Sequence, residues 1–259
     1  MGVLADILAA KREEIRELRN RALPVPPPRR PVRLERGAGE PLRLIAEIKR
    51  RSPSAGPLST RLSVGERAAA YERAGAAMVS VLCDARFFDG GYPHLTEARG
   101  AVALPLLCKE FVIDEVQLDA ARAFGADAVL IIVRCLTPDR VAALVAAARE
   151  RDLVPFVEIA NEAEARIALD AGADLIGVNA RDLDTLAMDP QRAETVLAGL
   201  PEGITRVHLS GLSSAADVAR VAVGPADAAL IGEALMRLDD PESLLSSLVA
   251  TARAGARSA

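Results

Sequence analysis

Lysine, histidine, cysteine and aromatic residues are all scarce in this chain. Its 259 residues include 32 basic side chains, of which only three are lysines, and they include two histidines, three cysteines and no tryptophan. The cysteines, Cys83, Cys108 and Cys135, are odd in number, widely spaced and form no CxxC motif, so no disulfide framework or zinc site is indicated. None has a histidine beside it in sequence, which favours small buried side chains over nucleophiles. Two histidines also argue against a Ser/His/Asp triad or a histidine-rich metal site.

Long apolar runs and excess positive charge are missing as well. No segment approaches the roughly 18 apolar residues that span a bilayer, and the longest strongly apolar run covers residues 141–148. A net charge of −4 and a pI near 5.4 argue against nucleic acid or an anionic membrane as the main partner. Acidic residues enter residues 1–20 at once and no cleavage site follows, unlike in a signal peptide. We therefore expect a soluble cytoplasmic protein, and a monomer.

Apolar strand-like runs and amphipathic helix-like runs alternate from residue 44 onward. The pattern repeats eight times, and such alternation requires parallel strands joined by crossover helices. It predicts an α/β fold, a (β/α)8 TIM barrel forming one domain over residues 1–259, with 1–43 as an N-terminal extension. The predicted strands are 44–48, 78–82, 104–108, 128–133, 154–158, 175–178, 205–209 and 228–231, and the predicted helices include 64–74, 116–124, 138–151, 162–171, 215–221 and 241–253.

The N-terminal extension has two parts. Residues 1–20 predict an amphipathic helix that acts as a lid or brace on the core, because its apolar residues share one side. Residues 22–41, rich in proline and arginine, predict an extended linker. The apolar side of the helix contains Leu4, Ile7, Leu8, Ile15 and Leu18.

Polar residues gather just after the predicted strands, which is where barrel enzymes build their sites. In residues 44–59, Glu47 and Lys49 lie two apart and so point the same way from a strand that two prolines and a glycine then end. The other strand ends supply Asp84, Lys109, Arg134, Glu158, Asn179 with Arg181, Ser210 with Gly211, and Gly232 with Glu233.

Two of the three lysines, Lys49 and Lys109, fall at these strand ends, whereas the third is Lys11. Arginine cannot release its proton near neutral pH, but burial can lower a lysine pKa enough for it to do so. We infer that Lys49 and Lys109 transfer protons or supply compact charges. A solvated or ion-paired lysine is the alternative interpretation.

Glu158 ends the apolar run 154–157, where an unpaired carboxylate is unfavourable, so we expect a general base. Asn179 and Arg181 follow the buried run 175–178. Arg181 either clamps a substrate carboxylate or phosphate, or pairs with Asp182 or Asp184. Both interpretations stay open.

Glycine-containing loops follow the seventh and eighth strands, at Ser210–Gly211 and Gly232–Glu233. Barrels commonly bind phosphate there through backbone N–H groups, although ordinary turn glycines would look the same.

Long motifs in register along nearly the whole chain resemble the indole-3-glycerol phosphate synthase family, a tryptophan-biosynthesis barrel with an N-terminal helical extension. Residues 44–59 are similar to the family signature. The further motifs are AAKREEI, CDARFFDGGYPHL, LPLLCKEFVID, FVEIANEAEA, DLIGVNARDLDTL and LIGEALMRLDDP. Several long motifs in order make the resemblance specific.

The resemblance implies a lyase, a decarboxylase that turns 1-(2-carboxyphenylamino)-1-deoxyribulose 5-phosphate into indole-3-glycerol phosphate, CO2 and water without metal or cofactor. It implies that Lys109 is the general acid, that Glu158 balances developing positive charge, and that Glu47 and Lys49 orient the substrate and assist dehydration. Asn179 and Arg181 would position the substrate. The phosphate would meet Lys49, Ser210, Gly211, Gly232 and Glu233. The ring would meet Phe88, Phe111 and Leu130, with Ser52 as a polar contact and Leu230 as a further substrate-binding residue. Asn179 and Ser210 are also counted among the catalytic residues.

One position departs from the family pattern, because a glutamate usually precedes the Ser-Gly of strand seven and Leu209 stands there. This leaves a catalytically weakened or altered phosphosugar-binding paralogue as an alternative. Two rivals from other classes are a barrel of the phosphoribosylanthranilate isomerase type, which needs a matched cysteine and aspartate, and a non-catalytic phosphate-binding protein.

Overall fold

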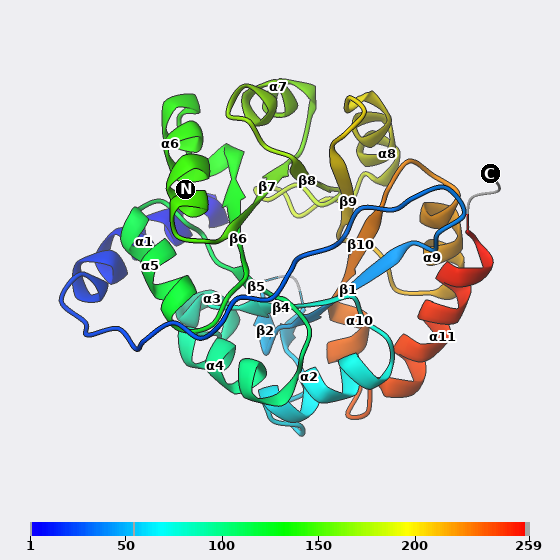
Figure 1. Cartoon of the computed structure of the whole chain (residues 1–259), viewed down its shortest axis with the longest axis horizontal. Helices are drawn as coiled ribbons and strands as arrows, with labels where there is room; N and C mark the ends of the chain where they lie inside the picture. The colour runs from blue at the N-terminus through cyan, green and yellow to red at the C-terminus, as the bar shows by residue number, and fades with distance from the viewer. Residues whose placement is uncertain (1, 54, 257–259) are drawn as a thin grey trace.

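Eight parallel strands close into a barrel in the computed structural model, which describes residues 2–53 and 55–256 (Figure 1). The first strand in the chain pairs with both the second and the last barrel strand, and this pairing closes the sheet. The predicted (β/α)8 barrel is confirmed. The barrel strands are β1 (Arg43–Ile48), β4 (Met78–Leu82), β5 (Leu106–Lys109), β6 (Ala128–Ile132), β7 (Val154–Ile159), β8 (Leu175–Asn179), β9 (Thr205–Leu209) and β10 (Ala228–Ile231), and a small hairpin pairs β2 (Arg51–Ser52) with β3 (Gly56–Pro57).

Helices surround the barrel and connect successive strands (Figure 1). The main ones are α1 (Val3–Leu18), α2 (Val64–Arg73), α4 (Tyr92–Ala101), α5 (Glu115–Ala123), α6 (Pro138–Glu150), α7 (Glu162–Asp170), α8 (Pro190–Gly199), α9 (Ala215–Ala222) and α11 (Glu242–Ala254). Short helices α3 (Ala85–Phe88), η1 (Val133–Cys135) and α10 (Glu233–Met236) follow strands β4, β6 and β10.

Most predicted boundaries agree with the structure to within one or two residues, and three differences have clear causes. Strand β5 begins at Leu106 instead of 104, because Pro105 has no N–H to donate to the ladder. The strand predicted to end at Val133 ends at Ile132, where η1 begins. Helix α8 was not predicted; it begins at Pro190 after Asp189 accepts a hydrogen bond from Arg192 N. Met1 of the predicted helix 1–20, and Ser54 of the first loop, lie outside the described residues.

Alternation along the strands separates two apolar layers. Side chains such as Ile45, Leu130 and Phe156 fill the inside of the barrel, while neighbours such as Ala46 and Ile131 pack against the surrounding helices. Continuing the inward series by two residues reaches Glu47 from Ile45 and Glu158 from Phe156, although it reaches the apolar Ile132 from Leu130. The same period of two that builds the core therefore aims the site residues into the mouth of the barrel.

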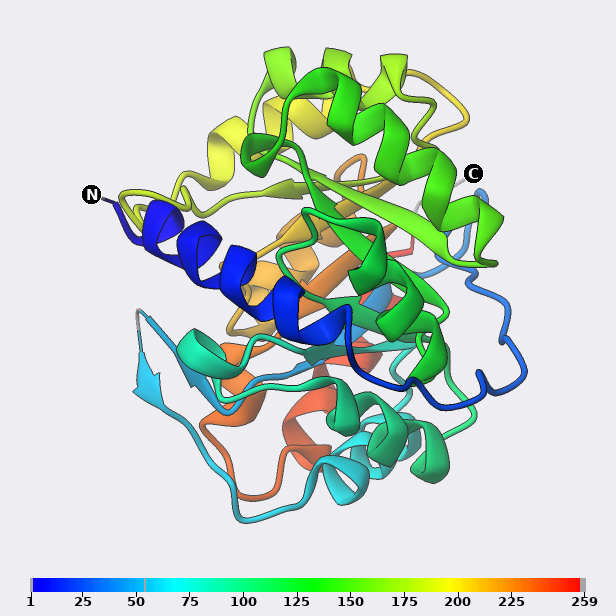
Figure 2. The same cartoon turned by 90° about the vertical axis from the view of Figure 1, so that its left-hand side faces the viewer.

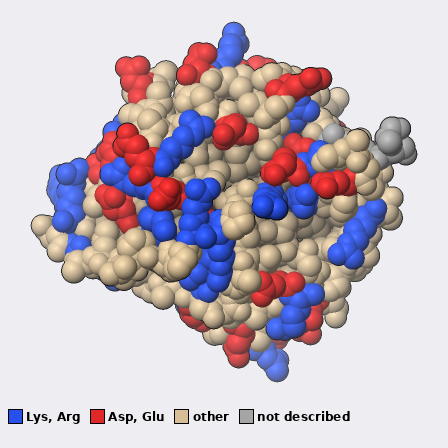
Figure 3. All heavy atoms as spheres, viewed as in Figure 1, with Lys and Arg blue, Asp and Glu red and all other residues tan. Residues whose placement is uncertain are grey.

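The N-terminal extension reaches both poles of the barrel (Figure 2). Helix α1 packs beside α5, with its first residues at the pole where the strands end, and the following segment crosses the opposite pole (Figures 1 and 2). Arg30 anchors this segment: its N–H donates to Asp127 Oδ1 at 2.7 Å and its guanidinium to Leu104 O at 3.1 Å. Acidic and basic side chains are intermixed on the face that the segment crosses (Figure 3). Within the described residues, no helix combines the length and apolar character needed to cross a membrane.

Candidate active site

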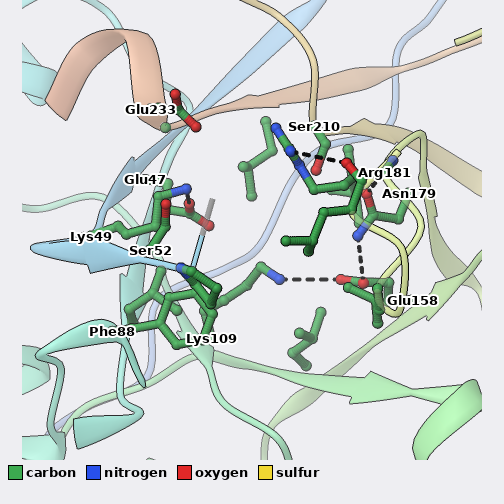
Figure 4. Close-up of a pocket in the computed structure, with 18 of the residues that line it drawn as sticks. Glu47, Lys49, Ser52, Phe88, Lys109, Glu158, Asn179, Arg181, Ser210 and Glu233 are labelled. Atoms are coloured by element: carbon green, nitrogen blue, oxygen red, sulfur yellow. Dashed lines mark hydrogen bonds and ion pairs between the residues drawn. The ribbon is translucent and has the colours of Figure 1, made fainter. Parts of the chain in front are cut away.

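A cavity of about 450 Å³ opens at the carboxyl ends of the barrel strands. Its size suits a small-molecule ligand. Every site residue implied by the family resemblance lines it: Glu47, Lys49, Ser52, Phe88, Lys109, Phe111, Leu130, Glu158, Asn179, Arg181, Ser210, Gly211, Leu230, Gly232 and Glu233. Asp84 and Arg134, which also follow predicted strands, do not line it and instead pair with Lys11 and Asp182. Figure 4 shows ten of them converging on one space.

Lys109, Glu158 and Asn179 form a hydrogen-bonded chain across the cavity (Figure 4). Lys109 is the last residue of β5, and its Nζ donates to Glu158 Oε2 at 3.1 Å. Asn179 Nδ2 donates to the other oxygen, Oε1, at 2.8 Å. The Glu158 side chain is only 2% exposed and that of Lys109 is 19% exposed. Both carboxylate oxygens therefore have partners, which makes burial of this charge tolerable.

The Lys109 ammonium has a raised pKa, which corrects the expectation of a lowered one. Burial alone lowers the pKa of this group, but the negative charges of Glu158 and Glu47 and the hydrogen bond to Glu158 outweigh that effect. Lys109 is consequently a protonated donor across the neutral range. This charge state suits a general acid and excludes a resting base.

Glu47 and Lys49 lie beside each other at the end of β1, with Lys49 Nζ 3.0 Å from Glu47 Oε1. The pair is 5% and 15% exposed, respectively. Gly232 permits this arrangement, because a Cβ at that position would come within 2.6 Å of Glu47 Oε1. A larger residue where the loop after β10 approaches the pair would therefore displace the Glu47 carboxylate.

Arg181 extends the chain from Asn179: its backbone N–H donates to Asn179 Oδ1 at 2.9 Å. Its guanidinium donates to Leu186 O at 3.3 Å and lines the cavity. Within the described residues it makes no ion pair with Asp182 or Asp184, because Asp182 pairs with Arg134 at 2.7 Å. Hydrogen bonds from the Thr185 backbone and from Arg134 lower the pKa of Asp182. Of the two interpretations, a guanidinium available to a substrate anion agrees with the structure.

The loops after β9 and β10 line another side of the cavity. Ser210 and Gly211 have left-handed φ values of 68° and 81°. Glu233 turns its carboxylate to Arg237, which donates to it at 2.7 Å. The backbone N–H of residue 233, and not its carboxylate, is thus the group suited to an anion. Sequence reasoning did not identify Arg237, although it also lines the cavity.

Apolar side chains form the remaining walls. The rings of Phe88 and Phe111 are 6.1 Å apart and tilted by 33°. In the strand order β5 lies diametrically opposite β9, so Phe111 follows a strand across the barrel from Ser210. Figure 4 likewise places Phe88 across the cavity from Ser210. The cavity therefore has an aromatic side and a side suited to an anion.

Helix α1 closes part of the aromatic side. The sequence predicted this helix as a lid or brace on the core, but it did not predict which side of the cavity the helix would cover. Val3, Leu4 and Ile7 line the cavity. Leu4 and Ile7 belong to the predicted apolar side of the helix, which is the signal that could have identified them. Glu110, Leu183 and Leu186 also line the cavity and were not predicted.

Leu209 points into the barrel, is 2% exposed and pairs with Asn179 and Leu230 in the sheet. His208 cannot replace the missing carboxylate, because it pairs with Val178 and Ala229, which belong to the outer apolar layer. Burial lowers the pKa of His208, consistent with a neutral imidazole there. Among the described residues, no group of three or more His, Cys, Asp or Glu side chains could hold a metal ion.

A sequence profile of the family described as indole-3-glycerol phosphate synthase matches residues 4–248. The chain belongs to the indole-3-glycerol phosphate synthase family. The indole-3-glycerol phosphate synthase of an Exiguobacterium species is 41% identical over 248 residues, which cover 96% of each chain. Indole-3-glycerol phosphate synthase 2 of Streptomyces coelicolor is 44% identical over 208 residues, covering 80% of this chain and 81% of the relative.

Solved structures support the barrel at the level of fold. The 3-hexulose-6-phosphate synthase from Salmonella typhimurium has a TM-score of 0.65 at 15% identity, covering 81% of this chain and 98% of that chain. The thiamine phosphate pyrophosphorylase from Pyrococcus furiosus has a TM-score of 0.62 at 17% identity, covering 83% of this chain and 96% of that chain. At these identities the likeness concerns the fold alone.

Proposed function

We propose that this family member converts 1-(2-carboxyphenylamino)-1-deoxyribulose 5-phosphate to indole-3-glycerol phosphate, CO2 and water. The observation that carries the proposal is the Lys109–Glu158 pair, which lies between an aromatic wall and loops suited to a phosphate. The substrate has the same layout, with a benzoate ring at one end and a phosphate dianion at the other. One cavity can therefore hold both ends while the acid reaches the reacting carbonyl.

Ring closure joins an aromatic ring carbon of the substrate to its carbonyl carbon. The Lys109 ammonium, whose pKa is raised, donates a proton to the carbonyl oxygen as that oxygen becomes a hydroxyl. Positive charge develops on the ring and its nitrogen, and the Glu158 carboxylate stabilises it from the dry wall of the cavity. Loss of CO2 then removes the charge and leaves the new hydroxyl in place.

Dehydration requires that hydroxyl to leave as water, with a proton from the donor, while the neighbouring carbon loses a proton to the acceptor and the ring double bond forms. Glu47 and Lys49 suit this step because they hold a carboxylate and an ammonium side by side at 3.0 Å, as a proton acceptor and donor. Lys49, the Ser210–Gly211 loop and the backbone after Gly232 would hold the phosphate. Asn179 and Arg181 would fix the substrate between these groups, because Asn179 is itself held by Glu158 and by the Arg181 backbone.

We also propose that the chain forms one folding domain and works as a monomer in the cytoplasm. The intact site within a single chain supports the monomer, and the free thiols of Cys83 and Cys108, both buried, agree with a reducing compartment. Size-exclusion chromatography with light scattering would test the oligomeric state, with a mass near 27.3 kDa as the expected result.

Turnover of the carboxyphenylamino substrate tests the function. Because the protein has no tryptophan, the indole fluorescence of the product can be followed without tryptophan background. We expect product and CO2 in equal amounts from the wild type, although Leu209 replaces the usual glutamate. Binding of substrate without product would instead favour the phosphosugar-binding paralogue.

A further inference from the structure

The third lysine of the chain, Lys11, lies buried among three carboxylates outside the proposed chemistry. Its side chain is 1% exposed, and its Nζ is 2.7 Å from Asp84 Oδ2, 3.0 Å from Glu110 Oε1 and 2.6 Å from Glu14 Oε2. Asp84 and Glu110 are themselves buried, whereas Glu14 is partly exposed. Burying a lysine with two carboxylates is unfavourable unless their geometry is well fixed. The cluster is therefore expected to have a specific structural role that offsets the cost of burying its charges.

Each of the two buried carboxylates accepts a backbone hydrogen bond from a segment that carries one of the cavity's phenylalanines. Asp84 follows β4 and caps α3, where its Oδ1 accepts a hydrogen bond from Phe87 N at 2.6 Å. Phe88 is the next residue. Glu110 follows Lys109, and its Oε1 accepts from Phe111 N at 2.7 Å. The Lys11 ammonium thus connects, through one carboxylate each, the segments that present Phe88 and Phe111.

The same helix face reaches the cavity. Leu4, Ile7 and Lys11 follow one another at spacings of three and four residues, so they lie along one side of α1. Leu4 and Ile7 line the same cavity as the two phenylalanines and belong to the apolar cluster that contains Phe111 and against which Phe88 packs. Fixing Lys11 therefore also fixes the part of α1 that closes the aromatic side.

We propose that Lys11 is a positioning residue, which sets the aromatic side of the cavity by joining α1 to the segments after β4 and β5. It touches no reacting atom in this arrangement. The proposal rests on the proposed function, because it assigns the aromatic side to the substrate ring. It predicts an effect on ring binding and little effect on phosphate binding, since the ion-pair partners of Lys11 among the described residues lie on α1 and after β4 and β5, not in the loops after β9 and β10.

Equilibrium binding of two probes tests this without requiring turnover. The first probe is indole-3-glycerol phosphate, followed by its fluorescence, and the second is inorganic phosphate, followed by its competition with that ligand. In Lys11→Met we expect the Kd of the indole compound to rise at least tenfold and the phosphate competition constant to stay within twofold. Arg12→Met is the matched control, because it removes one exposed positive charge from the same helix and should change neither value.

A second variant covers the case in which Lys11→Met does not fold. Lys11→Met/Asp84→Asn removes one buried charge of each sign and keeps a side-chain oxygen to cap α3, so it should fold and show the same selective loss of ring binding. Unchanged affinity for the indole compound in a folded variant would overturn the proposal, as would an equal loss for both probes. A wild type that binds the indole compound but does not turn over the substrate would contradict the proposed function. The proposed role of Lys11 in ring binding would be unaffected by that result.

Discussion

At the scale of single residues, the charge state of Lys109 is decided by its neighbours. Burial favours the neutral amine, yet the carboxylates of Glu158 and Glu47 keep the ammonium and raise its pKa. The sequence could show that a lysine ends this strand, but it could not show whether the lysine pKa is raised or lowered. The carboxylates that raise it, Glu158 and Glu47, lie 49 and 62 residues away along the chain. Lys109 is therefore suited to act as a general acid, because Glu158 keeps its ammonium group protonated.

Replacing Glu158 by glutamine should therefore have two effects. The turnover number should fall by roughly 10²- to 10⁴-fold, since a charge-stabilising group in the site is lost. The Lys109 pKa should also fall, because its largest raising influence is removed, and the alkaline limb of the pH–rate profile should move to lower pH. Steady-state kinetics between pH 6 and pH 10 would check both effects. A profile that loses height without moving would disprove the coupling.

Leu209 is the second residue whose role can be tested. It packs on Gly177, where a Cβ would come within 2.6 Å of Leu209 Cδ1, so its place in the interior is tightly defined. Leu209→Glu should lower the free energy of unfolding by about 1–3 kcal/mol, because it buries a carboxylate in an apolar layer. Its turnover number should stay within about tenfold of wild type, since Lys49, Lys109 and Glu158 remain.

Urea unfolding and the fluorescence assay would measure the two outcomes for Leu209→Glu. Leu209→Gln is the control, because glutamine has nearly the shape of glutamate but no charge. A difference between the two variants therefore reports the effect of the charge on stability and turnover. An inactive wild type that becomes active only as Leu209→Glu would contradict the account and indicate a weakened paralogue.

At the scale of elements, a buried arginine of α2 holds α10, the short helix whose first residues line the cavity. Arg67 of α2 is 1% exposed and donates to Leu235 O and Leu238 O, each at 3.1 Å, at the end of α10. Last-turn carbonyls have no partner within their own helix, and a cation is favourable there. Arg67 thus fixes the element that begins beside the Gly232 backbone.

Arg67→Met should lower the free energy of unfolding by about 1–3 kcal/mol, because it removes the guanidinium donor from Leu238 O and leaves Leu235 O with only the Leu238 N–H, at 3.3 Å. Arg61→Met is the matched control, since Arg61 is 74% exposed and pairs with the partly exposed Asp239, and it should change stability very little. Urea unfolding monitored by circular dichroism would measure both. Equal stabilities of the two variants would refute this explanation.

The alternating elements were predictable because a period of two and a helical period follow directly from local burial. Helix α8 and the late start of β5 were harder to predict, because capping by Asp189 and the missing N–H of Pro105 are single-residue effects. Contacts of Lys11 with residue 110 could not be read from the sequence at all. They join residues 99 positions apart and exist only once α1 is packed.

At the scale of the whole molecule, the buried cluster of Lys11, Asp84 and Glu110 should make stability depend on pH. Burial raises the pKa of Glu110 to about 7, with Lys11 opposing the shift and Asp84 adding to it. Unfolded glutamate titrates near pH 4.3. The folded protein therefore binds more protons between about pH 4.5 and pH 7, so this group's contribution to the free energy of unfolding falls as pH rises through that window. Tyr92 and Cys83, which also face Glu110, have raised pKa values and titrate above the window.

The Glu110→Gln variant isolates this contribution. The free energy of unfolding of the wild type, relative to the variant, should fall by roughly 2–3 kcal/mol between pH 4.5 and pH 7.5. Urea unfolding at several pH values would measure the difference. A constant or rising difference would show that Glu110 does not titrate as described.

The central claim, that this barrel mouth performs acid-assisted ring closure, is tested most directly by the turnover number of Lys109→Arg. Arginine keeps the positive charge but cannot deliver a proton near neutral pH. We expect a loss of roughly 10²- to 10⁴-fold in turnover with the fold preserved, as judged by circular dichroism. Turnover within a few-fold of wild type would contradict the claim and leave Lys109 as a binding charge only.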